Sequence, residues 1–119
     1  MKVKVSEASG IMLDWLVGKA LGEYRPVTVP SYSTDWSQGG PIIDREKIAT
    51  QPYRIIGTTE SGKEIDEFDG WQALTLSKRY WMSGAKTHFG PTPLIAAMRC
   101  YVTSKLGDEV EVPDEFLEN

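Results

Sequence analysis

Cysteine and histidine are almost absent from this sequence, which has one of each, Cys100 and His88. One thiol forms no disulfide within a chain, and one cysteine with one histidine is too few for a four-ligand zinc site. A nucleophilic Ser–His–Asp or Cys–His arrangement would have to use His88, whose neighbours give no sign of activation. Cys100 falls inside a predicted helix, far from its N-terminus, so we expect a structural thiol. The sequence predicts no catalytic residue, metal site or cofactor.

Long hydrophobic runs are also absent. No stretch reaches the roughly 18 apolar residues of a membrane span, and residues 1–5 lack the apolar segment of a signal peptide. We therefore expect no membrane association and a cytoplasmic protein. The 119 residues, 40% hydrophobic and 25% charged, are typical of one globular domain over 1–119, long enough to bury a core without a disulfide or metal.

Acidic residues are missing from 70–107, although the chain has a net charge of −4. The bases of this acid-free block give it a net charge of +5, and they are Lys78, Arg79, Lys86, Arg99 and Lys105. Six acids lie in 108–119, predicted to be an acidic, partly extended tail, without which the net charge is +2. The overall charge argues against general nucleic-acid binding. The block either neutralises the tail as a solvated face or marks a site for an anion.

The first predicted helix spans residues 6–21. Its apolar residues recur at the i, i+3, i+4 and i+7 spacing of one buried stripe. That stripe comprises Ala8, Ile11, Met12, Trp15, Leu16 and Ala20. Ser6 or Ser9 is positioned to cap its start, and Gly22 to end it.

The second strong helix spans residues 92–106. Thr92 is its expected N-cap, Pro93 its first residue and Gly107 its terminating glycine. The predicted buried stripe comprises Leu94, Ala97, Met98, Tyr101 and Val102.

Residues 26–41 are rich in Gly, Pro and hydroxyl side chains and have no period, which predicts a long loop. Tyr32 and Trp36 give this loop apolar surface to pack, so we expect it to be functional. A short helix over 41–48 follows, with Pro41 at its first position, where the missing N–H costs nothing.

The central region predicts a small antiparallel sheet. Strand-like segments occur at 53–56 and 71–76, with a turn at 60–63 between them. Residues 77–90 receive no assignment, and 109–112 is expected to be extended. The whole predicts a small α+β domain, in which N- and C-terminal helices pack on a short antiparallel sheet.

Two loop-to-helix junctions, 33–41 and 90–93, are the candidate binding elements. The sequence has neither G-x-x-x-x-G-K-[ST] nor G-x-G-x-x-G, so it carries neither common phosphate loop. In both junctions Gly and Pro fix the backbone while polar side chains stand at a helix N-terminus, which favours anions. Pro41 and Pro93 each remove a donor. The alternative is structural, with Thr92 only an N-cap and 39–41 only a turn.

Aromatic residues accompany the basic block. Tyr80, Trp81 and Phe89 offer stacking surfaces, and basic side chains offer charge-assisted hydrogen bonds, which together suit a nucleotide-sized anion. Arg99 lies roughly 10 Å along its helix from the N-terminus, within reach of such a site.

Several segments together resemble the NinX-type family of small bacteriophage accessory proteins. They are Leu-Asp-Trp at 13–15, Ser-Thr-Asp-Trp-Ser-Gln-Gly-Gly-Pro-Ile-Ile at 33–43, Trp71, Gly-Pro-Thr-Pro-Leu-Ile-Ala-Ala-Met-Arg-Cys-Tyr-Val at 90–102 and Lys-Leu-Gly-Asp-Glu-Val at 105–110. The resemblance implies a phage accessory role in the host cytoplasm, with no established reaction.

The resemblance also bears on the site residues. Residues 51–70 match it less clearly, so we interpret them as a variable insertion. The positions that stand in the family-like motifs or beside them form the predicted ligand site. They are Ser33, Thr34, Asp35, Trp36, Gln38, Gly39, Gly40, Thr92, Pro93 and Arg99.

Three functional hypotheses follow. The first is a binding protein whose two junctions and basic block hold a small anionic ligand, such as a nucleotide-derived host signal sequestered in counter-defence. The second is an interaction module that binds a host or phage protein through Trp36, Trp81 and the acidic tail; a homo-oligomer is compatible with either. The third is an enzyme acting on a nucleotide with Asp35 as general base, for which one carboxylate near hydroxyls is weak support.

Overall fold

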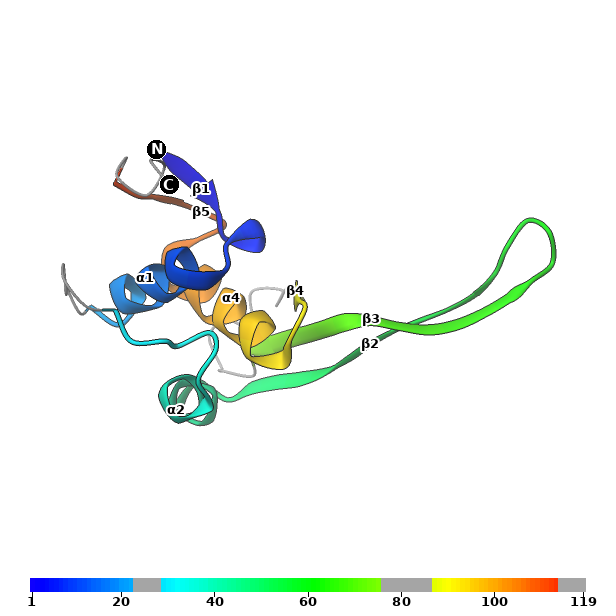
Figure 1. Ribbon diagram of the computed structural model, residues 1–119, viewed down its shortest axis with the longest axis horizontal. Coiled ribbons are helices and arrows are strands. Elements are labelled where there is room, and N and C mark those ends of the chain that lie inside the picture. Colours follow the sequence, from blue (N-terminus) through cyan, green and yellow to red (C-terminus); the bar gives the residue numbers. More distant parts are fainter. Residues whose placement is uncertain (23–28, 76–86, 114–119) are drawn as a thin grey trace.

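The computed structural model describes residues 1–22, 29–75 and 87–113. Over these residues it has three α-helices and two antiparallel sheets, which confirms the predicted α+β class. Figure 1 shows the helices gathered in one body, from which a long two-stranded hairpin projects. The radius of gyration is 15.7 Å, against about 13.5 Å for a compact domain of this length. The hairpin therefore extends well outside the packed core.

Helix α4, Pro93–Leu106, matches the prediction in every local detail. The Thr92 hydroxyl accepts a hydrogen bond from the Ile95 N–H at 3.1 Å, Pro93 is the first residue, and Gly107 (φ 94°) ends the helix. All five residues of the predicted stripe are buried. α4 lies at the centre of the fold and contacts the other helices and both sheets. Its residues Ala96, Ala97, Met98, Cys100 and Val102 are fully inaccessible.

Cys100 is a structural thiol, as expected. It is fully buried, and burial raises the pKa of its thiol to about 12. At neutral pH the group is therefore a small apolar side chain and not a nucleophile.

Helix α1, Gly10–Ala20, begins later than predicted. Val5–Glu7 form a separate 3-10 turn, η1, and Ser9 stands at the N-cap position without a side-chain capping bond. Ile11 was expected in the buried stripe but is 71% exposed, so that part of the prediction is wrong. Ile11 lies in the first turn of the helix, and the buried face is formed by Leu13, Asp14, Leu16 and Val17.

Helix α2, Trp36–Glu46, corrects the prediction of a loop through residue 41. Asp35 is the N-cap, Gly39 and Gly40 are helical, and Pro41 lies inside the helix instead of at its first position. Tertiary packing explains the difference, because Gly39 is buried against the Tyr32 carbonyl and Leu94. The Ser37 carbonyl, which loses its Pro41 partner, belongs to an exposed residue, so the lost bond is not buried in the core.

The central sheet is formed by β2, Ile48–Thr58, β3, Glu64–Thr75, and β4, His88–Gly90, in the order β2-β3-β4. The predicted strands and turn lie where expected, but the hairpin is much longer and includes the supposed insertion 51–70. Leu76 and 77–86 lie outside the described residues. Among the described residues, β4 pairs with Trp71, Gln72 and Ala73 of β3. Beyond this point the hairpin continues as a two-stranded ribbon (Figure 1).

A second sheet joins the two ends of the described chain. β1, Lys2–Lys4, pairs antiparallel with β5, Glu109–Glu111, so the predicted extended segment is confirmed (Figure 1). Lys2 lies opposite Glu111, and Lys4 opposite Glu109. Opposite charges on facing positions stabilise a strand pair. The first acids of the tail therefore serve the fold, and 114–119 lie outside the described residues.

Candidate functional site

A pocket of about 400 Å³ lies where η1, β3, β4 and α4 meet. Its volume falls within the range of small-molecule sites. Polar side chains at its wall include a guanidinium, a carboxylate, an imidazole and two hydroxyls. The lining residues are Ser6, Asp69, Gly70, Thr87, His88, Phe89, Gly90, Pro91 and Arg99. We take this pocket as the candidate functional site.

Two glycines allow the elements around this pocket to meet. Gly70 has a φ of +72°, and a Cβ there would lie 2.8 Å from the Gly90 carbonyl oxygen. A Cβ on Gly90 would lie 2.7 Å from the Ala96 amide nitrogen. Both distances are below van der Waals contact. β3, β4 and the first turn of α4 therefore approach one another only because these two positions lack side chains.

Arg99 supplies the positive charge of the pocket. Its Nε donates to the Ala8 carbonyl oxygen at 2.8 Å, and its Nη1 donates to the Phe89 carbonyl oxygen at 2.9 Å. In the described part of the chain no carboxylate lies within ion-pair distance of it. Burial lowers the pKa of Arg99 from its ordinary value. A guanidinium has five N–H donors and stays charged near neutral pH, so donors remain for a ligand anion.

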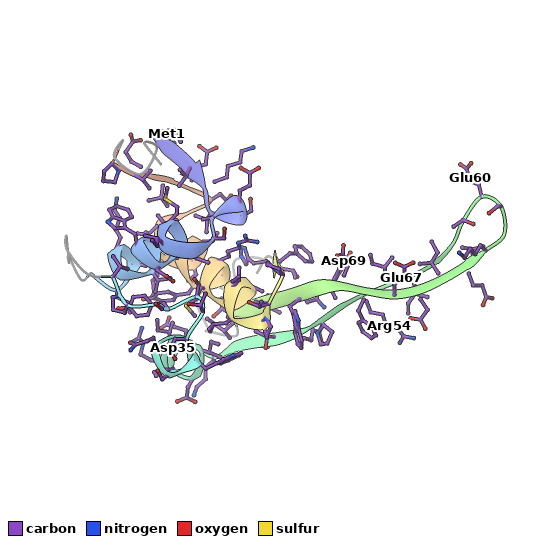
Figure 2. The ribbon with its side chains drawn as sticks, in the orientation of Figure 1. Met1, Asp35, Arg54, Glu60, Glu67 and Asp69 are labelled. Atoms are coloured by element: carbon purple, nitrogen blue, oxygen red, sulfur yellow. The ribbon has the colours of Figure 1, made fainter. Side chains whose placement is uncertain are left out.

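Asp69 contributes a negative charge to the pocket that contains Arg99. It is exposed and stands at the base of the projecting hairpin, next to Gly70 (Figure 2). Its carboxylate lowers the local potential and weakens the attraction for an anion. His88 lies in strand β4 and is half-buried, so it is a wall residue of the pocket and not part of an irregular loop.

The first predicted junction lies outside this pocket. The buried Ser33 donates its N–H and its hydroxyl to Asp14 Oδ1, both at 2.7 Å, and so fixes the segment before α2. Asp35 lies beside α2 in Figure 2 and caps that helix by accepting from Ser37 N at 2.9 Å and Ser37 Oγ at 2.7 Å. These hydrogen bonds lower the pKa of Asp35. The helix terminus thus already has an anionic cap.

The other predicted site residues divide between structural and exposed positions. Thr34, Trp36 and Gln38 are exposed, Trp36 at 54%. Thr92 is engaged as the cap of α4, and Pro93 begins that helix. Gly39 packs against Leu94, the residue that follows the second junction, and a Cβ added at Gly39 would lie 2.7 Å from Leu94 Cδ1. Gly40 lies one residue further along α2, and of all ten predicted residues only Arg99 lines the described pocket.

Sequence reasoning missed most of the pocket wall. Phe89 was predicted as an aromatic residue that accompanies the basic block. In the structure its ring makes an edge-to-face contact with the Tyr53 ring, with 5.0 Å between the ring centroids. Asp69 and Gly70 were not predicted, because only the register of β3 with β4 brings them to the pocket. Ser6 was not predicted, because η1 reaches β4 only through the packing of the folded chain. The signal in the sequence for this contact between β3 and β4 was the presence of glycine at both 70 and 90. Tyr80, Trp81 and the bases Lys78, Arg79 and Lys86 lie outside the described residues.

Among residues 1–22, 29–75 and 87–113, no three His, Cys, Asp or Glu side chains are grouped to hold a metal ion. None of the helices described here has the length and apolar character needed to cross a bilayer.

The family model described as "Bacteriophage P22, NinX" matches residues 4–105. The chain belongs to the NinX family. The match extends from β1 through nearly all of α4, and so includes the hairpin that the sequence suggested was an insertion. Among curated proteins no sequence matches this NinX-family chain. Family membership supplies a phage origin for the fold and assigns no ligand.

Proposed function

We propose that this NinX-family protein is a binding protein that holds a small anionic ligand in the pocket beside Arg99. The observation that carries the proposal is a partly buried guanidinium, held by two backbone carbonyls, in a pocket of about 400 Å³. Burying a charge without a counter-ion is costly, and an incoming anion would relieve that cost. The Ser6 and Thr87 hydroxyls add donors for phosphate oxygens.

A nucleotide-derived host signal is the ligand class that we favour. Such a ligand combines a phosphate for Arg99 with an aromatic base, and Phe89 is 49% exposed at the pocket wall. In a phage protein, sequestration of such a signal would serve counter-defence. The role of binder instead of enzyme is supported by Asp35, whose Oδ1 is held by Ser37 and whose lowered pKa makes it a weak base.

Calorimetric titration with inorganic phosphate and with a nucleoside monophosphate at low salt tests this proposal. We expect saturable binding that Arg99→Gln weakens by about tenfold or more, since charged hydrogen bonds are lost. Asp69→Asn should tighten binding by about threefold, because a like charge is removed. These opposite changes separate a ligand site from a purely structural Arg99.

Lys105→Gln is the matched control for these titrations. Lys105 lies on the same helix, is 47% exposed and contacts Glu46 at 3.5 Å, away from the pocket lining. It should leave binding unchanged. Absence of binding by the native chain, or equal binding by folded Arg99→Gln, would refute the proposal.

A protein-interaction role is the second candidate, and the 54% exposure of Trp36 favours it. Trp81 and 114–119 lie outside the described residues. Deleting all of 108–119 would be a poor test, because Val110 and Val112 are buried in the fold. Trp36→Ala combined with Gln at the tail acids 114, 115 and 118 keeps the second sheet intact. This variant should lose a protein partner in a pull-down, and an unchanged partner list would count against this role.

A further inference from the structure

The distal part of the hairpin, residues 53–69, is here termed the arm. The two strands of the arm pair with each other, and within the described chain no third strand pairs with either of them there. Both outer edges of the ribbon therefore present backbone N–H and C=O groups that a further strand can use. A two-stranded hairpin is only marginally stable alone in water, so such an arm gains from being covered.

One face of the arm carries an exposed apolar pair. Arg54 lies opposite Phe68, and Ile56 lies opposite Asp66. Opposed residues, and alternate residues on one strand, share a face of the ribbon, so Ile56 and Phe68 are on the same face. Ile56 is 67% exposed and Phe68 is 65% exposed. Ile56 and Phe68 stand at diagonal positions of this face, which also carries the Arg54–Asp66 ion pair. Within the described chain no other element covers the face (Figure 1), so both apolar side chains stand in solvent.

The arm is also strongly acidic. It contains five acids and two bases, for a net charge of −3. Arg54 is engaged by Asp66 in a two-bond ion pair, with Nε–Oδ1 and Nη2–Oδ2 both 2.7 Å. The acids that remain are Glu60, Glu64, Glu67 and Asp69. Figure 2 shows Glu60 at the tip, with Glu67 and then Asp69 closer to the body. Negative charge is thus distributed along the whole arm.

The negative charge of the arm favours a basic protein over a second copy of the chain, nucleic acid or anionic lipid as its partner. A second copy of the chain would bring its own acidic arm against this one, and like charges on facing strands are destabilising. Nucleic acid and anionic lipid are repelled for the same reason. A protein surface with basic side chains attracts the arm, and an unpaired strand on that protein matches the open ribbon edges.

We propose that the arm is a docking element for a basic protein, which adds a strand to the ribbon and covers Ile56 and Phe68. The acidic side chains steer and orient this partner, while the apolar pair provides buried contact area. The pocket at Arg99 and the apolar pair of the arm are separate surfaces, and Tyr53, which contacts Phe89, and Asp69 stand at the boundary between them.

Site-specific photo-crosslinking in phage-infected bacterial cells tests this proposal. The probe is p-benzoylphenylalanine at position 68 of the full chain, with the same probe at position 11 as control. Ile11 is 71% exposed but lies on α1, away from the arm. We expect an adduct with one protein from position 68 only, mapped by mass spectrometry to a strand segment of net positive charge.

A triple variant tests whether binding of the partner requires the negative charge of the arm. It combines Glu60→Gln, Glu64→Gln and Glu67→Gln. This variant leaves Asp69 and the Arg54–Asp66 ion pair in place, so the pocket and the ribbon stay intact. It should reduce the adduct by about tenfold, because electrostatic steering is lost, while calorimetric binding of a nucleoside monophosphate is unchanged. Three results would overturn the proposal. The first is equal adduct formation from positions 68 and 11, the second is an adduct with a second copy of the chain or with nucleic acid, and the third is an adduct that the charge variant does not reduce.

Discussion

Replacing Gly39 with alanine is expected to lower the free energy of unfolding by about 3 kcal/mol, as overpacking of a filled core does at its upper range. A Cβ at this position would overlap the Tyr32 carbonyl oxygen and lie 2.7 Å from Leu94 Cδ1. The first of these is backbone, which cannot rotate away. The segment before α2 would have to shift away from the helix. Thermal denaturation should show a loss of about 10 °C or more in Tm.

Gly40 provides the matched control for Gly39. The nearest atom to a Cβ on Gly40 is Trp36 Cε3 at 4.0 Å, an ordinary contact. Gly40→Ala should therefore raise stability by about 0.5–1 kcal/mol, because alanine loses less entropy in a helix. Equal stabilisation by both substitutions would contradict the close packing of Gly39 against the Tyr32 carbonyl and Leu94.

Replacing Asp14 with alanine is the second substitution with a large expected effect, a loss of about 2–4 kcal/mol in the free energy of unfolding. Asp14 is 6% exposed and Ser33 is 1% exposed, and one carboxylate oxygen accepts both the N–H and the hydroxyl of Ser33. Alanine leaves a buried N–H without its acceptor, and it frees the segment that leads into α2. Chemical denaturation measures the change.

Asparagine at position 14 distinguishes the hydrogen bonds from the volume of the side chain. Asp14→Asn keeps an acceptor oxygen at the same place and should cost about 1 kcal/mol, while Ser33→Ala removes only the hydroxyl bond and should cost a similar amount. Equal losses for Asp14→Asn and Asp14→Ala would show that the paired bonds to Ser33 are not what stabilises this segment.

Helices α4 and α2 show what local sequence signals determine. α4 was predicted to within a residue because its N-cap, its proline and its terminating glycine act on their own helix. In α2 the local signals oppose helix formation, since Gly39, Gly40 and Pro41 all disfavour a helix interior. The helix forms because Asp35 caps it and because it packs on Tyr32 and Leu94. Such tertiary contacts have no local pattern in the sequence.

The arm and the pocket were predicted only in part. The sequence marked 53–56 and 71–76 as strands, but acids interrupt the alternation between them, so the full ribbon was not recognised. Arg99 was predicted as a binding residue because it stands in a family-like motif about two turns into its helix, where its long side chain can reach back toward the helix N-terminus. The rest of the pocket depends on the register of β3 with β4, which brings Gly70 against Gly90. That register is a long-range property of the folded chain.

The most direct test of the ligand site is the Arg99 side chain itself, observed as its Nε–Hε signal in ¹⁵N NMR spectra. Addition of a nucleoside monophosphate should shift this signal saturably, together with the backbone amides of His88, Phe89 and Gly90. The Ser37 amide at the capped start of α2 should stay in place. A saturable shift at Ser37 with no change at Arg99 would place the ligand at the first junction and contradict this account, as would no shift at either position.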